Sequence, residues 1–235
     1  MVQGELDRLK KYNLFTATFV VTLSWIGVAW FVEAEFLKSF VPLILLMDTT
    51  MMTILLVGAT LFYEKKEHTM NSIMVSPVTV NEYLASKVVV SVINSLLTLV
   101  TVSAAVYFLK GVTFNYLLFF PAVILVSAAH TVIGILLSYF AKDFTSMLVN
   151  YIIYVFVFML PSILILLGVI DETVGKFLFI LPPESANILI SAAAREVEAW
   201  RIIAGYVYLS LLSLGIYRFI VRPKFMGYVM KETGV

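Results

Sequence analysis

The chain has 235 residues, of which 61% are hydrophobic and 13% are charged. Its mean hydropathy is +1.00. A soluble domain carries about 25% charged residues, so this composition excludes a soluble globular protein and predicts an all-α integral membrane protein. The net charge of +1 argues against a nucleic-acid partner, and the absence of cysteine excludes disulfides and cysteine-ligated metal sites.

The first feature along the chain is a short basic segment before the first apolar run. Leu6 and Leu9 alternate with Arg8, Lys10 and Lys11. This pattern is typical of an amphipathic helix that lies along the inner leaflet of a membrane. The alternative is a frayed basic end that only sets the topology.

Six apolar runs are long enough to cross a bilayer, which takes about 20 residues in a helix. The first run exceeds the apolar core of a secretory signal, about 7–15 residues, and is therefore predicted to be a retained span. The six spans form one transmembrane domain, predicted at 13–32, 40–62, 88–109, 114–140, 147–170 and 202–221.

A further apolar stretch precedes the last span and is interrupted by Pro182 and Pro183. Two adjacent prolines remove two backbone donors and stop a helix, which leaves two pieces too short to cross. We expect a re-entrant or interfacial hairpin over 174–197 on the outer side.

The basic residues fix the expected orientation. With six spans and the N-terminus inside, eleven of the sixteen Lys and Arg residues lie on the inner side. This asymmetry follows the positive-inside rule. We therefore expect a multi-pass protein of the cell membrane with both termini in the cytoplasm.

The long polar segment 63–87 separates the second and third predicted spans. A charged run at its start is followed by apolar residues at helical spacing, and Pro77 then breaks the helix. Thr79 and Glu82 match a capping box, in which each side chain satisfies a free amide at a helix start. The segment thus predicts a cytoplasmic elbow made of a helix, a break and a capped restart.

Three pieces of this segment carry a family resemblance: 62–70 (FYEKKEHTM), 75–78 (VSPV) and 82–87 (EYLASK). Together they resemble the cytoplasmic loop of type-2 ABC exporter permeases. Within that class the chain looks most similar to the short permeases of fluoroquinolone-type drug exporters, partly through 46–49 (LMDT). His68 stands where the family more often has glycine, which puts the turn geometry there in question.

The resemblance implies that the elbow is a coupling helix seated in a groove of a separate ATPase. The chain itself has no phosphate-binding Gly-x-x-x-x-Gly-Lys-Ser/Thr motif, so ATP and Mg would be bound by the partner. Two permease subunits, expected to form a homodimer rather than a heterodimer, would assemble with two ATPase subunits and contact membrane lipids. The expected coupling residues are Glu64, Lys65, Lys66, Glu67, His68, Thr69, Met70, Ile73, Met74, Val75, Ser76 and Pro77, followed by Thr79, Glu82, Tyr83 and Lys87 where the chain re-enters the membrane. Without the resemblance, the charges would be interpreted as a solvated loop.

Polar residues inside the spans are the remaining candidates, because ionisable groups at membrane depth are expensive and often functional. Asp48 is expected either to line a translocation path or to bond to a neighbouring helix. His130 lies among small residues and is interpreted as a packing histidine, and Asn94, Thr98 and Thr101 as contacts between helices. The predicted path comprises Asp48, Thr49 and Thr53 in the second span and, by the resemblance, Asn150, Tyr151 and Tyr154 in the fifth.

No catalytic constellation is present in the sequence, so the chain is not expected to be an enzyme. The leading hypothesis is the membrane subunit of an ATP-driven exporter of a hydrophobic or amphipathic compound. Two alternatives stay open: a proton-coupled carrier that uses Asp48 and His130, and a membrane immunity or assembly factor that transports nothing.

Overall fold

The computed structural model describes residues 1–230, without the side chains at 71, 74, 166, 172, 175 and 176. The predicted coupling side chain of Met74 therefore lies outside the described residues. The described part of the chain contains helices and no strands, which confirms the all-α prediction.

Six helices are long and apolar enough to cross a membrane, as predicted. Short amphipathic α1 (Val2–Lys11) precedes the first, α2 (Leu14–Phe31). The second span joins α3 (Ala34–Met47), a π-helical turn η1 (Asp48–Met52) and α4 (Thr53–Lys66). Short α5 (Thr69–Met74) leads to the third and fourth spans, α6 (Val80–Lys110) and α7 (Tyr116–Tyr139). The fifth span runs through α8 (Phe144–Tyr154), η2 (Val155–Met159) and α9 (Leu160–Leu166). After α10 (Glu172–Leu178) and α11 (Pro182–Ser191), the chain ends with α12 (Ala199–Ile216), η3 (Tyr217–Val221) and α13 (Arg222–Met230).

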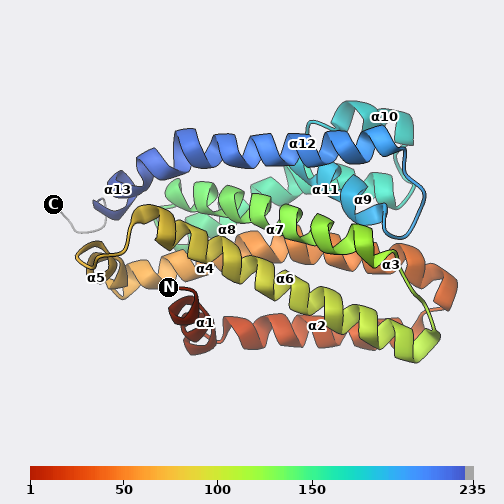
Figure 1. Ribbon diagram of the computed structural model, residues 1–235, viewed down its shortest axis with the longest axis horizontal. Coiled ribbons are helices and arrows are strands. Elements are labelled where there is room, and N and C mark those ends of the chain that lie inside the picture. The colour runs from red at the N-terminus through yellow and green to blue at the C-terminus, as the bar shows by residue number, and fades with distance from the viewer. Residues whose placement is uncertain (231–235) are drawn as a thin grey trace.

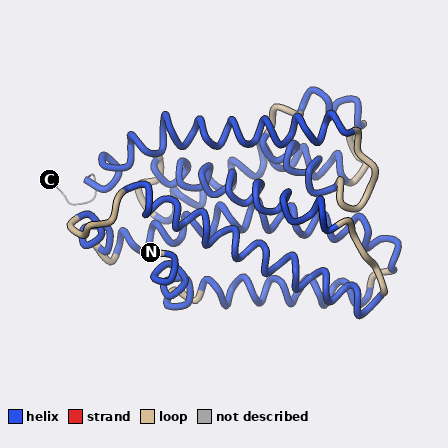
Figure 2. The backbone as a smooth tube through the Cα atoms, viewed as in Figure 1, coloured by secondary structure: helices blue, strands red, loops and turns tan. Residues whose placement is uncertain are grey.

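The spans lie side by side as one bundle, with α1, α5 and α13 at the same end (Figure 1). We call this end, which also carries the N-terminus, the elbow end. The loop before α3, the loop between α6 and α7, and helices α9 to α11 lie at the opposite end (Figure 2). An even number of crossings therefore brings both ends of the described chain to one side.

Helix α7 is central to the core. It packs against α4, α6, α11 and α12. At its crossing with α4 only glycine fits at position 134, because a Cβ there would lie 2.5 Å from Val57 Cγ1 and 3.1 Å from Ile54 Cα. Small residues of this kind let membrane helices approach closely.

The elbow loop is shorter than the predicted 63–87. Helix α4 continues to Lys66 and α6 already starts at Val80, so the connection covers only 67–79. The predicted segment 63–87 extended from just before the first charged residue after one span to the last before the next, and it therefore includes the ends of both helices. At 1.5 Å per residue the 31 residues of α6 extend about 47 Å, longer than the roughly 30 Å hydrocarbon core.

The proline pair before the last span begins a helix as well as ending one. Pro182 and Pro183 occupy the first two positions of α11, where a missing amide hydrogen does no harm. Helix α11 is buried against α3, α7, α9 and α12. Two short helices therefore replace a seventh span, and the re-entry of 174–197 into a bilayer stays a prediction.

Candidate functional site

The elbow turns sharply out of α4 through His68. Its φ of +54° is in the left-handed region that favours glycine. This geometry explains why glycine suits the position and how histidine still makes the turn. After the turn, α5 carries Met70 back against the bundle, where it is 2% exposed in a cluster with Leu61, Tyr83 and Phe225.

Among the side chains that the structure describes between 66 and 79, the exposed ones are polar except Val75, which we call the tip of the elbow, and Pro77. Val75 is 89% exposed just after α5, and Ser76 and Pro77 follow it. The Ser76 hydroxyl donates to the carbonyl of Ile73 at 2.6 Å and fixes this bend. The other exposed elbow residues are Lys66, Glu67, His68, Ser72, Pro77 and Thr79.

The restart of the chain at α6 has the predicted capping box. The Glu82 backbone N–H donates to Thr79 Oγ1 at 3.3 Å, and the Thr79 N–H donates to the Glu82 carboxylate at 2.8 Å. Both amides that the helix start leaves free are thus satisfied. Farther along the same helix end, the Tyr217 hydroxyl of η3 donates to Asn81 at 2.9 Å.

Beneath the elbow lies a buried ion cluster that joins α1, α4 and α6. Lys87 Nζ lies 2.7 Å from Glu5 and 2.5 Å from Glu64. Arg8 reaches the same two carboxylates at 2.5 and 2.7 Å. The Tyr83 hydroxyl also donates to Glu64. We call Glu5, Arg8, Glu64, Tyr83 and Lys87 the ion cluster.

The ion cluster is electrically balanced, with two carboxylates and two cations. Burial raises the pKa of Glu5, and the Lys87 ammonium opposes that rise. Removing one partner from such a cluster leaves an uncompensated charge away from water, so the four ions hold one another in place. The three helices they belong to are therefore tied together at the elbow end.

A second set of contacts links α1 to the first residues of the elbow. Lys11 Nζ lies 2.6 Å from Glu67, and the Tyr12 hydroxyl donates to the same carboxylate at 2.9 Å. The Lys11 hydrogen bond is the main reason why the pKa of Glu67 is lowered. The ring of Tyr12 also stacks on Tyr63 with centroids 4.7 Å apart.

These contacts correct the sequence-based expectation for four coupling and re-entry residues. Glu64, Met70, Tyr83 and Lys87 are all at most 3% exposed, so they face the bundle interior and present nothing to a partner. The family resemblance of the segment had indicated contact with a partner, and it does not show which side chains of the segment are buried. Likewise, Glu5 and Arg8 of α1 face the ion cluster, which the prediction of a membrane-surface helix did not foresee.

Midway along the bundle, the predicted path residues of the second span form part of a buried polar layer. Thr98 Oγ1 donates to Asp48 Oδ1 at 3.1 Å, and Thr53 Oγ1 lies 3.5 Å from the Ser95 hydroxyl. The Thr49 hydroxyl instead donates to its own helix, at the carbonyl of Leu45. Within the described structure the second Asp48 oxygen, Oδ2, has no hydrogen-bond partner.

His130 and the path residues of the fifth span lie across α7. His130 Nδ1 bonds to the Val126 carbonyl at 2.9 Å, while its Nε2 meets no partner among the described atoms. Its ring stands edge-on to Tyr154 with centroids 6.2 Å apart. Asn150 donates to the Leu137 carbonyl at 3.3 Å, and Tyr151 is half-buried. The hydrogen bonds of the two halves of the predicted path thus involve different helices, α6 for Asp48 and α7 for Asn150.

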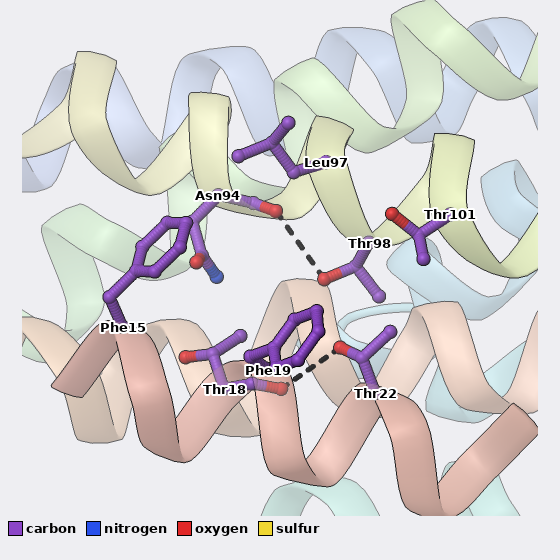
Figure 3. Close-up of a pocket in the computed structure, with 8 residues that line it drawn as sticks. All are labelled: Phe15, Thr18, Phe19, Thr22, Asn94, Leu97, Thr98 and Thr101. Carbon is purple, nitrogen blue, oxygen red and sulfur yellow. Dashed lines mark hydrogen bonds between the residues drawn. The ribbon is translucent and has the colours of Figure 1, made fainter. Parts of the chain in front are cut away.

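A small cavity lies between α2 and α6, with polar walls and an apolar rim (Figure 3). Thr18 and Thr22 face it from α2, and Asn94 and Thr98 from α6. The volume is about 40 Å³. Phe15, Phe19, Leu97 and Thr101 complete its lining.

Comparison with known proteins agrees with this geometry. The family model for the fluoroquinolones export permease protein family matches residues 1–233. The chain belongs to this family. Two curated relatives, both named fluoroquinolones export permease protein and both from strains of Mycobacterium tuberculosis, are 25% identical over 233 residues, covering 98% of this chain and 95% of theirs. No solved structure gives a significant match.

In this export permease one deeply placed carboxyl group was not predicted from the sequence. Glu184 of α11 is 1% exposed. Asn187 donates to it at 3.4 Å and accepts from Ser191 at 2.9 Å. The sequence signal for this buried carboxyl group was an acidic residue between a proline pair and an apolar stretch. It was not used because 174–197 was assigned to an outer hairpin.

Proposed function

We propose that this permease is the membrane subunit of an ATP-driven ABC exporter, and that a separate ATPase drives it through the elbow. The observation that carries the proposal is the exposed tip at Val75, mounted on helices that the ion cluster ties together. In such a subunit the exposed Val75 and its polar neighbours would lie against the ATPase.

The transmission of force follows from the connections of the elbow. Helix α5 joins the second span to the third, and both bear ion-cluster residues, Glu64 on α4 and Lys87 on α6. Arg8 and Glu5 add α1 to the same unit. Pressure on the tip would therefore move three helices together, because none can shift without exposing or unpairing a buried charge.

The resulting surface also decides which elbow residues we assign to the ATPase. We propose that the exposed elbow residues contact the ATPase, chiefly Lys66, Glu67, Val75 and Pro77. The half-buried residues Lys65, Thr69, Ile73 and Ser76 would support them. His68 sets the turn between them. The buried members Glu64, Met70, Tyr83 and Lys87 are proposed to transmit the movement.

The substrate class follows from the relatives, which are named for fluoroquinolone export. We infer a planar aromatic compound of amphipathic character, moved outward between two permease subunits. Asp48, Thr49, Thr53, Asn150, Tyr151 and Tyr154 remain the proposed path lining. Both termini and the elbow would lie in the cytoplasm of a cell-membrane protein, where ATP and Mg are available to two ATPase subunits.

The experiment uses inside-out vesicles that contain the permease together with an ABC ATPase encoded next to the permease gene. ATP should drive uptake of a fluorescent fluoroquinolone, and Val75→Asp should reduce this uptake at least tenfold by placing a charge in the apolar contact. Val169→Asp is the matched control, because Val169 is 69% exposed in a loop at the opposite end. Uptake that needs a proton gradient and ignores ATP would support the carrier alternative, and equal effects of the two variants would contradict coupling through the elbow.

A further inference from the structure

Helix α6 carries a continuous polar stripe, of which the exporter proposal uses only the first residue, Lys87. Lys87, Ser91, Asn94, Thr98 and Thr101 follow one another at steps of four and three residues, so they share one face of the helix. The stripe begins in the ion cluster and reaches the level of Asp48, because Thr98 donates to Asp48 Oδ1 at 3.1 Å. A polar face of this length inside a membrane bundle calls for partners along its whole course.

Two separate cavities accompany this stripe, and the side chain of Asn94 lines both. The first, of about 20 Å³, is lined by Glu5 and Lys87 of the ion cluster, by Ser91 and by Asn94. The second, of about 40 Å³, extends from Asn94 past Thr98 and is the cavity of Figure 3. A cavity needs roughly 10–15 Å³ of such volume to hold one water molecule, so both have room for water.

The second cavity has polar groups on its inner wall and opens partly toward the outside of the bundle, where it is bordered by the exposed side chains of Phe15, Phe19 and Leu97. Thr18, Thr22, Asn94 and Thr98 are each at most 6% exposed, and their polar groups supply the partners that a buried water requires. On the outer side the aromatic rings of Phe15 and Phe19 form the rim. At 40 Å³ the cavity is far too small for a drug-sized ligand, whose sites measure about 300–1,000 Å³.

Asp48 lies beside the polar stripe at the level of the second cavity, and one of its carboxyl oxygens has no hydrogen-bond partner among the described residues. The residue is 6% exposed, and this oxygen is Oδ2. A carboxylate buried in that state is unfavourable, whereas a protonated carboxyl group needs fewer partners. The Thr98 hydroxyl connects it to the cavity, because the same side chain lines the cavity and bonds to Oδ1.

We propose that Asp48 is a proton-binding site that exchanges protons with the water at the elbow end through the two cavities and the Thr98 hydroxyl. In the uptake step, a hydronium ion in the second cavity gives a proton to Thr98 Oγ1 while the Thr98 hydroxyl proton passes to Asp48 Oδ1. One O–H bond breaks and one forms at Thr98, a water molecule remains, and the carboxylate becomes a carboxylic acid.

The buried ionisable groups of the ion cluster and of α7 are already engaged. Lys87 on α6 and Glu64 on α4 bond to each other in the ion cluster, with Glu5 of α1 beside them. His130 on α7 is bonded through Nδ1 to its own helix. Helix α2 carries no ionisable residue. Asp48 is therefore the group at the inner end of the stripe to which a proton would pass.

The test is infrared difference spectroscopy of the purified permease in lipid nanodiscs, without ATPase or substrate. The carbonyl band of a protonated carboxyl group, assigned by its loss in Asp48→Asn, should grow as the pH falls across about 9 to 3, a range that spans the ordinary and burial-raised pKa values of carboxyl groups. Where Asp48→Asn does not fold, ¹³C-labelled aspartate makes the assignment. A band that ignores both pH and heavy water would overturn the proposal.

The relay is tested by the rate at which this band shifts after transfer to heavy water. Thr98→Val keeps the shape but removes the hydroxyl and should slow the shift at least tenfold, and Thr98→Ser should restore it. Thr101→Val is the control, because Thr101 lines the same cavity without a bond to Asp48. Equal rates in Thr98→Val and the unmodified protein would contradict the relay. Neither result depends on ATP-driven transport, so this proposal and the exporter proposal can fail separately.

Discussion

The elbow end and the middle of the bundle treat buried charge in opposite ways. In the ion cluster both carboxylates are bonded to both cations, and Glu64 also accepts from Tyr83. In the middle, Asp48 Oδ2 and His130 Nε2 have no partners among the described residues. Burial alone does not distinguish these groups, because Glu5, Glu64 and Lys87 in the ion cluster and Asp48 and His130 in the middle are each at most 6% exposed.

The difference in pairing indicates a different role for each region. A fully paired set of ions resists movement of its members and gains nothing by changing protonation state, which suits a rigid connection. A carboxyl group with a free oxygen and a hydroxyl relay beside it can take up and release a proton. We therefore propose force transmission for the elbow end and proton exchange for the middle of the bundle.

The largest effect is expected from breaking the ion cluster. Lys87→Met leaves Glu5 and Glu64 without their shared cation and should lower the free energy of unfolding by about 3–5 kcal/mol. Lys66→Met is the control at an exposed position of the same segment and should change it by less than about 0.5 kcal/mol. Unfolding in mixed detergent micelles measures both, and similar values for the two would show that the ion cluster does not hold the helices together.

The crossing of α4 and α7 connects the two regions and should be the next most sensitive point. Gly134→Ala places a methyl group 2.5 Å from Val57 Cγ1, and the resulting overpacking should destabilise the protein by about 1–3 kcal/mol. Gly215→Ala on α12, where nothing lies within 4 Å, should be neutral or slightly stabilising. If Gly134→Ala behaves like Gly215→Ala in the same unfolding assay, the close crossing is not rigid.

A smaller effect is expected at the turn of the elbow. His68→Gly removes the strain of a left-handed residue, about 1 kcal/mol, although glycine also gains freedom in the unfolded chain. The free energy of unfolding should therefore stay equal or rise by less than about 1 kcal/mol. His68→Ala keeps the strain and loses the side chain, so its free energy of unfolding should be lower than that of His68→Gly. The reverse order would contradict the turn geometry.

The smallest change in stability is expected in the middle of the bundle. Asp48→Asn keeps an oxygen for the Thr98 hydroxyl and removes an ionisable group without a second partner, so the unfolding free energy should change by less than about 1 kcal/mol. Glu64→Gln, which removes a paired charge, is the comparison and should lose several times more. Equal losses in the two variants would erase the distinction between the regions.

Much of the fold could be predicted from the sequence, because apolar length, prolines and capping residues act locally. The six spans, the break near Pro77 and the Thr79–Glu82 capping box are all found in the structure. The family resemblance on the elbow segment agrees with the family model that matches residues 1–233.

The burial of the charged residues could not be predicted in the same way. Glu64 and Lys87 mark the ends of two spans, and their partner Glu5 lies 82 residues from Lys87 along the chain. A local pattern cannot show that three such residues meet, and the family resemblance indicated a contact with a partner instead. The polar spacing of Asn94, Thr98 and Thr101 was visible, but its bond to Asp48 and the cavity beside it required the packing of α2 against α6.

The central claim is that the elbow tip is the contact with a separate ATPase. The most direct measurement places a photoactivatable cross-linking amino acid at Val75, or at Val169 as the control, in cells that also produce the ATPase. The account predicts an ATPase adduct from position 75 and none from position 169. An adduct from neither position, or from both equally, would contradict it.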